Sequence, residues 1–418
     1  MSLRSFGVRT VHRGRCGRFM PISDFLVIGG GVIGLNIARE IKKSFADATV
    51  TVIEKEPSCG THASGRNSGV LHAGFYYTAD SLKARFTRDG NRLLTEYCEE
   101  RKIPLNRCGK LVVARDESED RMLDELLRRG QRNGVQLQEV SAEEVREIEP
   151  RAITFKRAIF SPTTSSADPS AVLMRMEQDA KVEGVAVRNS ESYVSMRNDR
   201  ITTKVNNYDA GYVINAAGLH ADKVARDFGF SKRFRILPFK GLYLKSSAPP
   251  GEFRTNIYPV PDLNNPFLGV HVTVQVDGHA KLGPTAIPAL WREQYNGLDN
   301  FRMGEFFEIA SRSASFFAAS RFDFKRLALT EMRKYSRRHM VSLASSLARG
   351  ITLDTFRNWS KPGIRAQLVD IQARKLEMDF VLEGDHKSMH VLNAVSPGWT
   401  CSIPFSRHVV EEIKRKLQ

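Results

Sequence analysis

The sequence lacks long apolar runs. No stretch approaches the ~20 consecutive apolar residues that a membrane-spanning helix requires, so any contact with a membrane is expected to be peripheral. Internal repeats and low-complexity linkers are also missing. At 418 residues, of which 41% are apolar, the chain can bury a large core and is longer than one ordinary domain. These features indicate a globular protein of two domains.

Cysteine is scarce and shows no functional spacing. The five cysteines form neither a CxxC pair nor a set with metal-ligand spacing, and their odd number argues against a secreted disulfide framework. We therefore predict no metal site and expect buried or incidental thiols. The cysteines are Cys16, Cys59, Cys98, Cys108 and Cys401.

Acidic residues are absent from residues 1–20, which contain five arginines, no lysine, and Ser and Thr scattered among apolar residues. This composition is typical of a mitochondrial transit peptide, and a disordered basic tail of a bacterial protein is the alternative. We therefore predict a mitochondrial location, with the bacterial cytoplasm or inner-membrane surface as the alternative. Residues 1–23 are excluded from the predicted fold.

A glycine-rich turn carries the first functional signal. Gly29-x-Gly31-x-x-Gly34 follows an apolar strand, and a second apolar strand, residues 50–53, ends at Glu54 about 20 residues after the third glycine. The glycines permit a tight turn, close approach of a pyrophosphate, and close packing of the next helix on the sheet. The helix N-terminus can hold the phosphate charge, and Glu54 can bind ribose hydroxyls. This spacing predicts a dinucleotide-binding βαβ unit.

The segment that follows, residues 62–77, favours FAD over NAD. It is crowded with glycine, hydroxyl and imidazole side chains, where a simple nicotinamide dehydrogenase would have an ordinary crossover helix. So little side-chain bulk suits close approach to a large flat ligand, with backbone N–H groups free to bind its oxygens. A flexible surface loop is the alternative, which the interleaved apolar residues disfavour. The predicted cofactor-binding residues of this loop are Ser64, Arg66, Asn67, Ser68 and Gly69.

This loop, together with Ser81-Leu-Lys83-Ala, resembles the flavin-proximal motif of the L-2-hydroxyglutarate dehydrogenases and oxidases, members of the D-amino-acid-oxidase-like flavoprotein superfamily. The resemblance covers nearly everything after residue 23. Two places depart from the family's pattern: residues 164–168 read Thr-Ser-Ser-Ala-Asp, and Trp399 stands where a smaller residue is common. Further matching segments begin at Cys108, Val213, Pro238, Ile257, Phe267, Gly283, Gly363 and Ser396.

The resemblance implies an α/β fold, with a Rossmann-like FAD-binding domain and a discontinuous substrate domain built on an antiparallel sheet. Asp168-Pro169 predicts the start of a helix that ends near Gly184. A helix that begins near Thr400 would direct its positive end at the flavin pyrimidine. The FAD-binding domain is assigned to residues 24–90, 151–235 and 361–418, and the substrate domain to residues 91–150 and 236–360. Further predicted cofactor-binding residues are Gly218, Gly363, Gly398 and Thr400.

Residues 270–276 alternate between polar and apolar side chains and are followed by the turn Asp277-Gly278, which predicts an antiparallel hairpin. A period of two puts His271, Thr273 and Gln275 on one face and the valines on the other. A polar face of this kind usually meets solvent, whereas the resemblance places it toward the flavin.

Oxidation of an α-hydroxy acid by FAD moves a hydride from C2 to flavin N5 and requires a base for the hydroxyl proton. Imidazole has a pKa near working pH, so His271 and His72 are the candidate bases. We assign the base to His271 and a role in FAD binding or loop shape to His72. Arg365 is the candidate carboxylate clamp, with a structural salt bridge as the alternative. Weaker candidates for the second carboxylate or the flavin edge are Lys240, Tyr258 and Arg66.

The predicted function is FAD-dependent oxidation of L-2-hydroxyglutarate to 2-oxoglutarate, and the nearest alternative is an amine oxidase of the sarcosine- or glycine-oxidase type. The electron acceptor stays open between a quinone, an electron-transfer protein and oxygen. Residues 311–340 hold eight Lys or Arg against two acids, which suggests a membrane-facing surface or an FAD-containing RNA-modifying protein. Since no stacking-aromatic motif or RNA-binding module accompanies this charge, no nucleic-acid partner is predicted.

Overall fold

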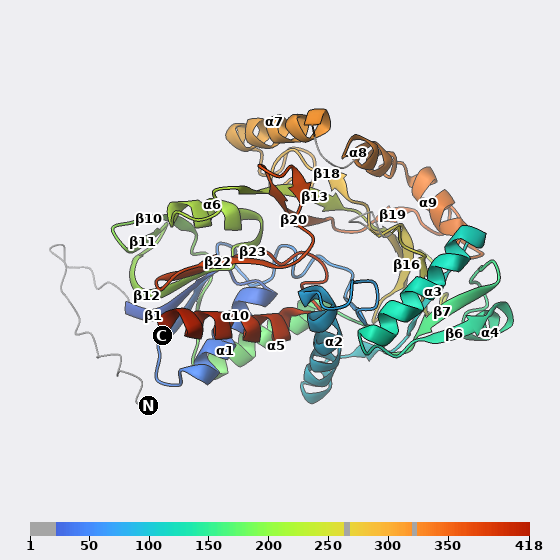
Figure 1. Ribbon diagram of the computed structural model, residues 1–418, viewed down its shortest axis with the longest axis horizontal. Helices are drawn as coiled ribbons and strands as arrows, with labels where there is room; N and C mark the ends of the chain where they lie inside the picture. The colour runs from blue at the N-terminus through green and yellow to red at the C-terminus, as the bar shows by residue number, and fades with distance from the viewer. Residues whose placement is uncertain (1–21, 263–267, 320–323) are drawn as a thin grey trace.

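The apolar run before the glycine turn forms an inner strand of a largely parallel sheet. The computed structural model describes residues 22–262, 268–319 and 324–418, and it places this sheet at one end of the molecule and a large, mainly antiparallel sheet at the other (Figure 1). The basic segment 1–20, with Cys16, lies outside the described residues, so the transit peptide stays a prediction.

The predicted strand–helix–strand unit is confirmed. It consists of β1 (Ile22–Ile28), α1 (Val32–Ser44) and β2 (Val50–Ile53). β1 pairs in parallel with β2 on one side and with β12 (Asn207–Asn215) on the other. β2 is buried along its whole length, as expected of a parallel strand covered on both faces. The other strands of this sheet are β9 (Ala186–Arg188), β10 (Tyr193–Arg197), β11 (Arg200–Thr203), β22 (Val381–Gly384) and β23 (Ser388–Asn393).

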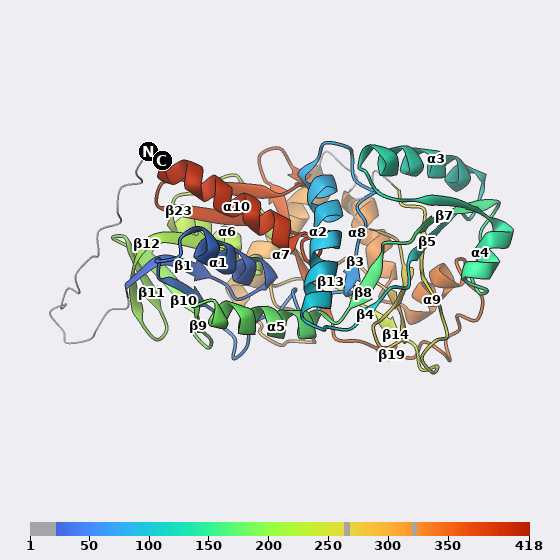
Figure 2. The same cartoon turned by 90° about the horizontal axis from the view of Figure 1, so that it is seen from below.

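Four helices pack into one core on a single face of this sheet, where Figure 2 shows three of them, α1, α5 and α10, side by side. α5 begins where predicted, because Asp168 accepts a hydrogen bond from the N–H of Ser170 (2.9 Å) and Pro169 occupies the first turn. The packed helices other than α1 are α2 (Leu82–Glu100), α5 (Pro169–Val182) and α10 (Ser402–Leu417), and the short α6 (Ala221–Asp227) lies near β23.

The second large sheet has eight strands in the order β19-β14-β17-β16-β15-β5-β7-β6. The predicted hairpin is confirmed as β16 (His271–Val274) and β17 (Ala280–Gly283), with Val272 and Val274 in the core beneath it. The remaining strands are β5 (Lys110–Val113), β6 (Gln138–Ser141), β7 (Arg157–Ser161), β14 (Leu244–Lys245), β15 (Asn256–Pro259) and β19 (Asn358–Trp359). The helices α3 (Glu117–Arg132), α4 (Ala142–Ile148) and α9 (Arg337–Ser345) pack against this sheet.

A four-stranded antiparallel sheet connects the two ends of the molecule. Its central strands β13 (Phe234–Gly241) and β20 (Gly363–Asp370) pair along their whole length, and β18 (Ile287–Pro288) and β21 (Lys375–Leu376) complete it. α7 (Met303–Ala319) and α8 (Phe324–Arg333) cover its outer face (Figure 1). β3 (Val70–Leu71), β4 (Leu105–Asn106) and β8 (Ser165–Ala167) form a small sheet below the predicted flavin loop.

Two predicted domain boundaries differ from the packing. Residues 157–161, expected in the FAD-binding domain, form β7, which pairs with β5 and β6 in the antiparallel sheet. The second half of α2, expected in the substrate domain, buries Leu94, Tyr97 and Cys98 in the core of the parallel sheet. Local patterns identified this strand and this helix but carry no information on their distant partners. No helix among the described residues is long and apolar enough to cross a membrane.

Candidate cofactor and substrate site

A cavity of about 790 Å³ opens at the carboxyl ends of β1, β2 and β12 and extends to β13 and β20. This is where open α/β sheets place their ligands. Its volume lies in the upper part of the range of small-molecule and cofactor pockets. The predicted cofactor residues that line it are Gly29, Gly31, Glu54, Ser64, Arg66, Asn67, Ser68, Gly218, Gly363, Gly398 and Thr400.

The glycine turn leaves a helix N-terminus open to the cavity. Gly29 has φ +112°, and a Cβ there would lie 2.6 Å from the carbonyl oxygen of Ala216, so only glycine fits this turn. Gly34 lies behind the cavity wall, where a Cβ would collide with the Gly29 carbonyl. The N-terminus of α1 has no capping side chain of its own and no acid in its first turn. Its N–H groups and dipole therefore favour an anion such as a pyrophosphate.

Glu54 is held rigidly at the end of β2. Its carboxylate is 7% exposed and accepts hydrogen bonds from the N–H groups of Gly30 (2.7 Å) and Glu56 (2.9 Å). A carboxylate has about four acceptor positions, so capacity remains for ribose hydroxyls.

Residues 62–69 form a tight loop with few bulky side chains in the cavity wall. The Ser64 Oγ accepts the N–H of Val32 at the start of α1 (3.0 Å). Asn67 fixes the loop internally, because its side chain donates to the Ser64 carbonyl (2.6 Å) and accepts the N–H of Gly69 (2.9 Å). Gly69 itself lies behind the wall against Ala167. Asn67 and Gly69 therefore shape the loop, and Asn67 also lines the cavity together with Ser64 and Ser68.

The catalytic candidates divide into two groups. His72 and Arg365 line the cavity, whereas His271, Tyr258 and Lys240 do not. Burial lowers the pKa of His72 well below the ordinary value, and the charges of Lys110, His271 and Arg365 lower it further. The imidazole of His72 is therefore neutral at neutral pH.

His271 is 3% exposed on β16 and stacks on Tyr258, with ring centroids 3.7 Å apart. Its Nδ1 lies 2.8 Å from the Gly269 carbonyl oxygen. This contact makes Nδ1 the donor and leaves the lone pair on Nε2. Burial lowers the pKa of His271 to about 3, although the Gly269 hydrogen bond opposes the shift.

Arg365 and Lys240 point to opposite faces of the β13–β20 sheet. In the antiparallel register Phe239 pairs with Arg365 and Lys240 pairs with Ile364, and directly paired residues share a face. Lys240 is 6% exposed, and burial lowers its pKa. The two cations therefore do not form a joint clamp.

Lys110 is a buried cation that the sequence prediction missed. It is 0% exposed at the start of β5, and burial lowers its pKa to about 7. The sequence offered one signal, since Lys110 lies in a segment that matches the family and opens an otherwise apolar strand.

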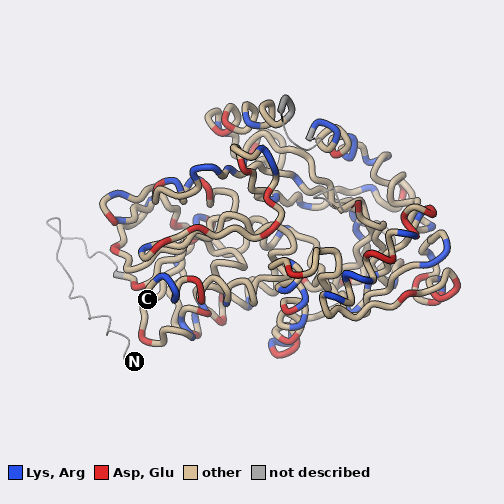
Figure 3. Tube along the Cα trace, viewed as in Figure 1, with Lys and Arg blue, Asp and Glu red and all other residues tan. Residues whose placement is uncertain are grey.

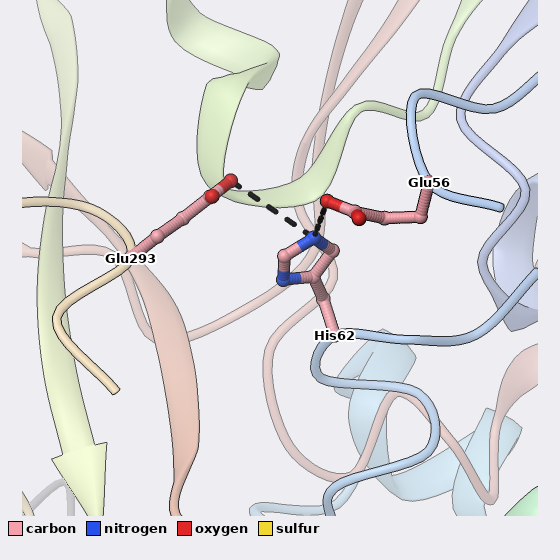
Figure 4. A group of neighbouring side chains, drawn as sticks. All are labelled: Glu56, His62 and Glu293. Carbon is pink, nitrogen blue, oxygen red and sulfur yellow. Dashed lines mark hydrogen bonds and ion pairs between the residues drawn. The ribbon is translucent and has the colours of Figure 1, made fainter. Parts of the chain in front are cut away.

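Glu56, His62 and Glu293 converge beside the cavity (Figure 4). Their donor atoms have the spacing of a cation site, but the Lys55 ammonium already contacts Glu56 (2.6 Å) and Glu293 (2.7 Å). Burial alone would raise the pKa of Glu293, but hydrogen bonds from His220 and Lys55 hold it well below its usual range. These residues form an ion-pair network that joins the segment after β18 to the loop after β2.

Comparison with known proteins identifies the family. A family model described as FAD dependent oxidoreductase, DAO, matches residues 24–412. The chain belongs to the DAO family of FAD-dependent oxidoreductases. Its relatives include an L-2-hydroxyglutarate dehydrogenase of Escherichia coli (33% identity; 94% of this chain and 94% of the relative covered) and a mitochondrial one of Nematostella vectensis (34%; 94% and 91%).

Two solved structures share the fold. An L-α-glycerophosphate oxidase from Mycoplasma pneumoniae with FAD bound has a TM-score of 0.72 at 21% identity, covering 94% of this chain and 95% of that one. A glycine oxidase from Geobacillus kaustophilus has a TM-score of 0.70 at 20% identity, with the same coverage. The predicted α/β fold with a Rossmann-like domain and an antiparallel substrate sheet is confirmed.

FAD is the cofactor of this DAO-family oxidoreductase, and the cavity residues fit it. The glycine turn and Glu54 suit its ADP half. At the other end a Cβ at Gly363 would collide with the Arg66 carbonyl oxygen, so this wall is built from backbone. Trp399 lines the cavity with its indole N–H buried and without an acceptor among the described residues, which suits a ligand rich in acceptor atoms.

Proposed function

We propose that this protein is an FAD-dependent dehydrogenase that oxidises L-2-hydroxyglutarate to 2-oxoglutarate. The observation that carries the proposal is the 33–34% identity, over 94% of the chain, with relatives named for that reaction. The chemistry of the site supports it, because Arg365 and the neutral His72 lie together in the cavity wall. A 2-hydroxy acid requires a cation for its carboxylate and a base for its hydroxyl.

Bound FAD supplies the acceptor for the hydride of C2. In the proposed reaction Arg365 holds the carboxylate next to C2, because its planar guanidinium can bind two carboxylate oxygens at once. His72 accepts the hydroxyl proton. We prefer His72 to His271 as the base, because His72 lines the cavity and His271 does not.

His271 then has a positioning role. Its ring is fixed by the Gly269 carbonyl and by the Tyr258 ring, and it lies close enough to His72 to influence the pKa of that imidazole. We propose that it helps to orient His72. Loss of a positioned base typically slows a reaction by ~10²–10⁴-fold, and loss of a positioning residue should cost less.

The N-terminus of α10 provides a further electrostatic contribution. Residues 398–400, immediately before α10, line the cavity, and the helix has neither a capping side chain nor an acid in its first turn. Its positive end would stabilise negative charge that develops on the cofactor.

Anaerobic mixing of the FAD-loaded protein with a panel of substrates tests the proposal. The panel contains L- and D-2-hydroxyglutarate, L-lactate, sarcosine and glycine, and the rate of flavin bleaching is recorded for each. L-2-hydroxyglutarate should bleach the flavin fastest. Fastest bleaching by an amine would identify an amine oxidase instead.

The assignment of the base is tested by two matched variants. His72→Gln should bind FAD and L-2-hydroxyglutarate but show flavin reduction slowed by ~10²-fold or more, whereas His271→Gln should slow it less. Normal reduction in His72→Gln together with no reduction in His271→Gln would return the base to His271.

A further inference from the structure

Residues 290–302, which we call the strap, connect β18 to α7 and form part of the wall of the cofactor cavity. Glu293, Asn300 and Arg302 of the strap line the cavity. The strap, all of which is described, contains no helix or strand. Among the described residues, its backbone-to-backbone hydrogen bonds are confined to local turns and the first turn of α7. Its position over the cavity therefore depends on contacts made by its side chains.

A buried ion pair fixes one end of the strap. Arg292 and Asp222 of α6 are both 0% exposed. The two terminal nitrogens of the Arg292 guanidinium donate to the two carboxylate oxygens of Asp222, at 2.7 and 3.0 Å. Separating such a pair would leave an uncompensated buried charge on each side. Arg292 therefore anchors the strap firmly to the FAD-binding domain.

Next to this anchor, Glu293 bridges the two sides of the glycine turn. Its Oε1 lies 2.7 Å from Lys55 Nζ and 3.0 Å from His220 Nε2. Lys55 follows β2 and His220 follows β12, and these two strands flank β1 in the sheet. Gly29 and Gly31 follow β1. The Glu293 carboxylate therefore joins the two neighbours of the turn at which the pyrophosphate is expected to bind.

Tyr295 adds two contacts between the strap and the loop after β2. Its hydroxyl lies 2.7 Å from His62 Nδ1, and the centroid of its ring lies 4.3 Å from the guanidinium carbon of Arg66. The side chains in the ionic contacts of Glu293 are 15–31% exposed, unlike those at the Arg292 anchor. Water and salt compete with partly exposed contacts, so these contacts can break while the anchor holds.

We propose that the strap is a latch that retains the cofactor. It closes across the pyrophosphate of bound FAD, opens about Arg292 when the contacts of Glu293 and Tyr295 break, and so sets the rate at which FAD leaves. The structure shows the closed position. The inference concerns the cofactor and not the compound that is oxidised, so its failure would leave the proposed function intact. Both tests below measure FAD release in the absence of substrate.

Tyr295→Phe removes the hydroxyl that contacts His62 and keeps the ring beside Arg66. The FAD-loaded protein is diluted, and release is followed by the rise in flavin fluorescence. Loss of one hydrogen bond should make release about 2–10-fold faster. Tyr335→Phe, at a tyrosine that is 50% exposed and outside the strap, is the matched control and should release FAD at the wild-type rate. Wild-type release from Tyr295→Phe, or equal acceleration in both variants, would overturn the proposal.

A cross-link tests the opening of the strap directly. The double variant Lys55→Cys/Glu293→Cys is loaded with FAD and treated with a short bis-maleimide, and intact mass confirms that the two thiols are joined. Before treatment the variant should release FAD faster than wild type, because the ionic contact is lost. After treatment it should release FAD more slowly than wild type, because the strap cannot open. Wild-type protein treated with the same reagent controls for reaction at the native cysteines. Wild-type release before treatment, or release that is equally fast after it, would overturn the proposal.

Discussion

Lys110→Met should make the protein more stable. Burial lowers the pKa of Lys110 from 10.5 to about 7. At about 1.4 kcal/mol per pH unit, a shift of this size corresponds to ~4–5 kcal/mol of destabilisation when the lysine is charged. Methionine has a similar length and can keep contacts with the rings of Phe75, Tyr76 and Tyr258, over which the ammonium lies, without burying a charge.

The sign of the pH dependence follows from proton binding. Lysine in the unfolded chain keeps its proton up to about pH 10.4, whereas Lys110 in the folded protein loses it above about pH 7. The unfolded state therefore binds more protons between these values, and stability rises with pH there. The destabilisation is complete below pH 7 and vanishes above pH 10.4. Lys110→Met should raise the free energy of unfolding by ~4 kcal/mol at pH 6 and by ~2 kcal/mol at pH 9.

Thermal unfolding of the FAD-loaded protein at pH 6 and pH 9 measures both effects. With an unfolding entropy of ~2.1 cal/mol/K per residue, 4 kcal/mol shifts the Tm of a chain of this length by ~5 °C. Lys375→Met, at a side chain that is 55% exposed, should change Tm little. A Lys110→Met protein that is less stable than wild type at both pH values, or equally stabilised at both, would refute the reasoning.

Two further substitutions and one binding assay test other parts of the structure. Gly31→Val should yield colourless protein, because a Cβ there already lies 3.0 Å from the Ser64 Oγ and a larger side chain blocks the pyrophosphate site; normal flavin absorbance would contradict this. Glu293→Gln should release FAD about tenfold faster, a loss of ~1.4 kcal/mol of binding free energy, because it weakens the contact with Lys55 across the cavity wall. Flavin fluorescence measures the release rate, with the exposed Glu411→Gln as control; an unchanged rate would assign the network to stability alone. Vesicles of anionic lipid should bind the protein in a salt-sensitive way, because α8 exposes Leu329 (50%) and Met332 (51%) among the Lys and Arg coloured blue in Figure 3. Each cation near the lipid surface contributes ~1 kcal/mol of binding free energy. Salt-independent or absent binding would contradict the prediction of a membrane-facing surface.

The nucleotide half of the fold could be predicted because its signals are local. These signals lie within one short stretch of sequence, and each has one structural reason to be there. They are an apolar strand, three glycines, a helix and Glu54. The partners of β7 and α2 could not be predicted, since nothing within residues 157–161 or 91–100 encodes which distant sheet they join. The sequence places Lys110 in a segment that matches the family. It does not show that Lys110 is buried among aromatic rings, because the three rings around its ammonium come from distant positions 75, 76 and 258.

The positions of His271 and His72 show the same limit of prediction from local sequence. Alternation along β16 correctly put His271 on the face opposite the valines. It could not indicate that the surrounding residues bury His271 and Thr273, nor that His72 reaches the cavity wall instead. Which of two imidazoles meets a ligand depends on tertiary packing, and a single strand's pattern does not contain it.

The central claim is that this cavity removes a hydride from C2 of L-2-hydroxyglutarate. Anaerobic mixing of the FAD-loaded protein with L-2-hydroxyglutarate, unlabelled and deuterated at C2, tests it in one experiment. We expect complete bleaching of the flavin, one equivalent of 2-oxoglutarate per flavin, and slower bleaching with the deuterated substrate. A flavin that stays oxidised, or that is reduced without formation of 2-oxoglutarate, would contradict it.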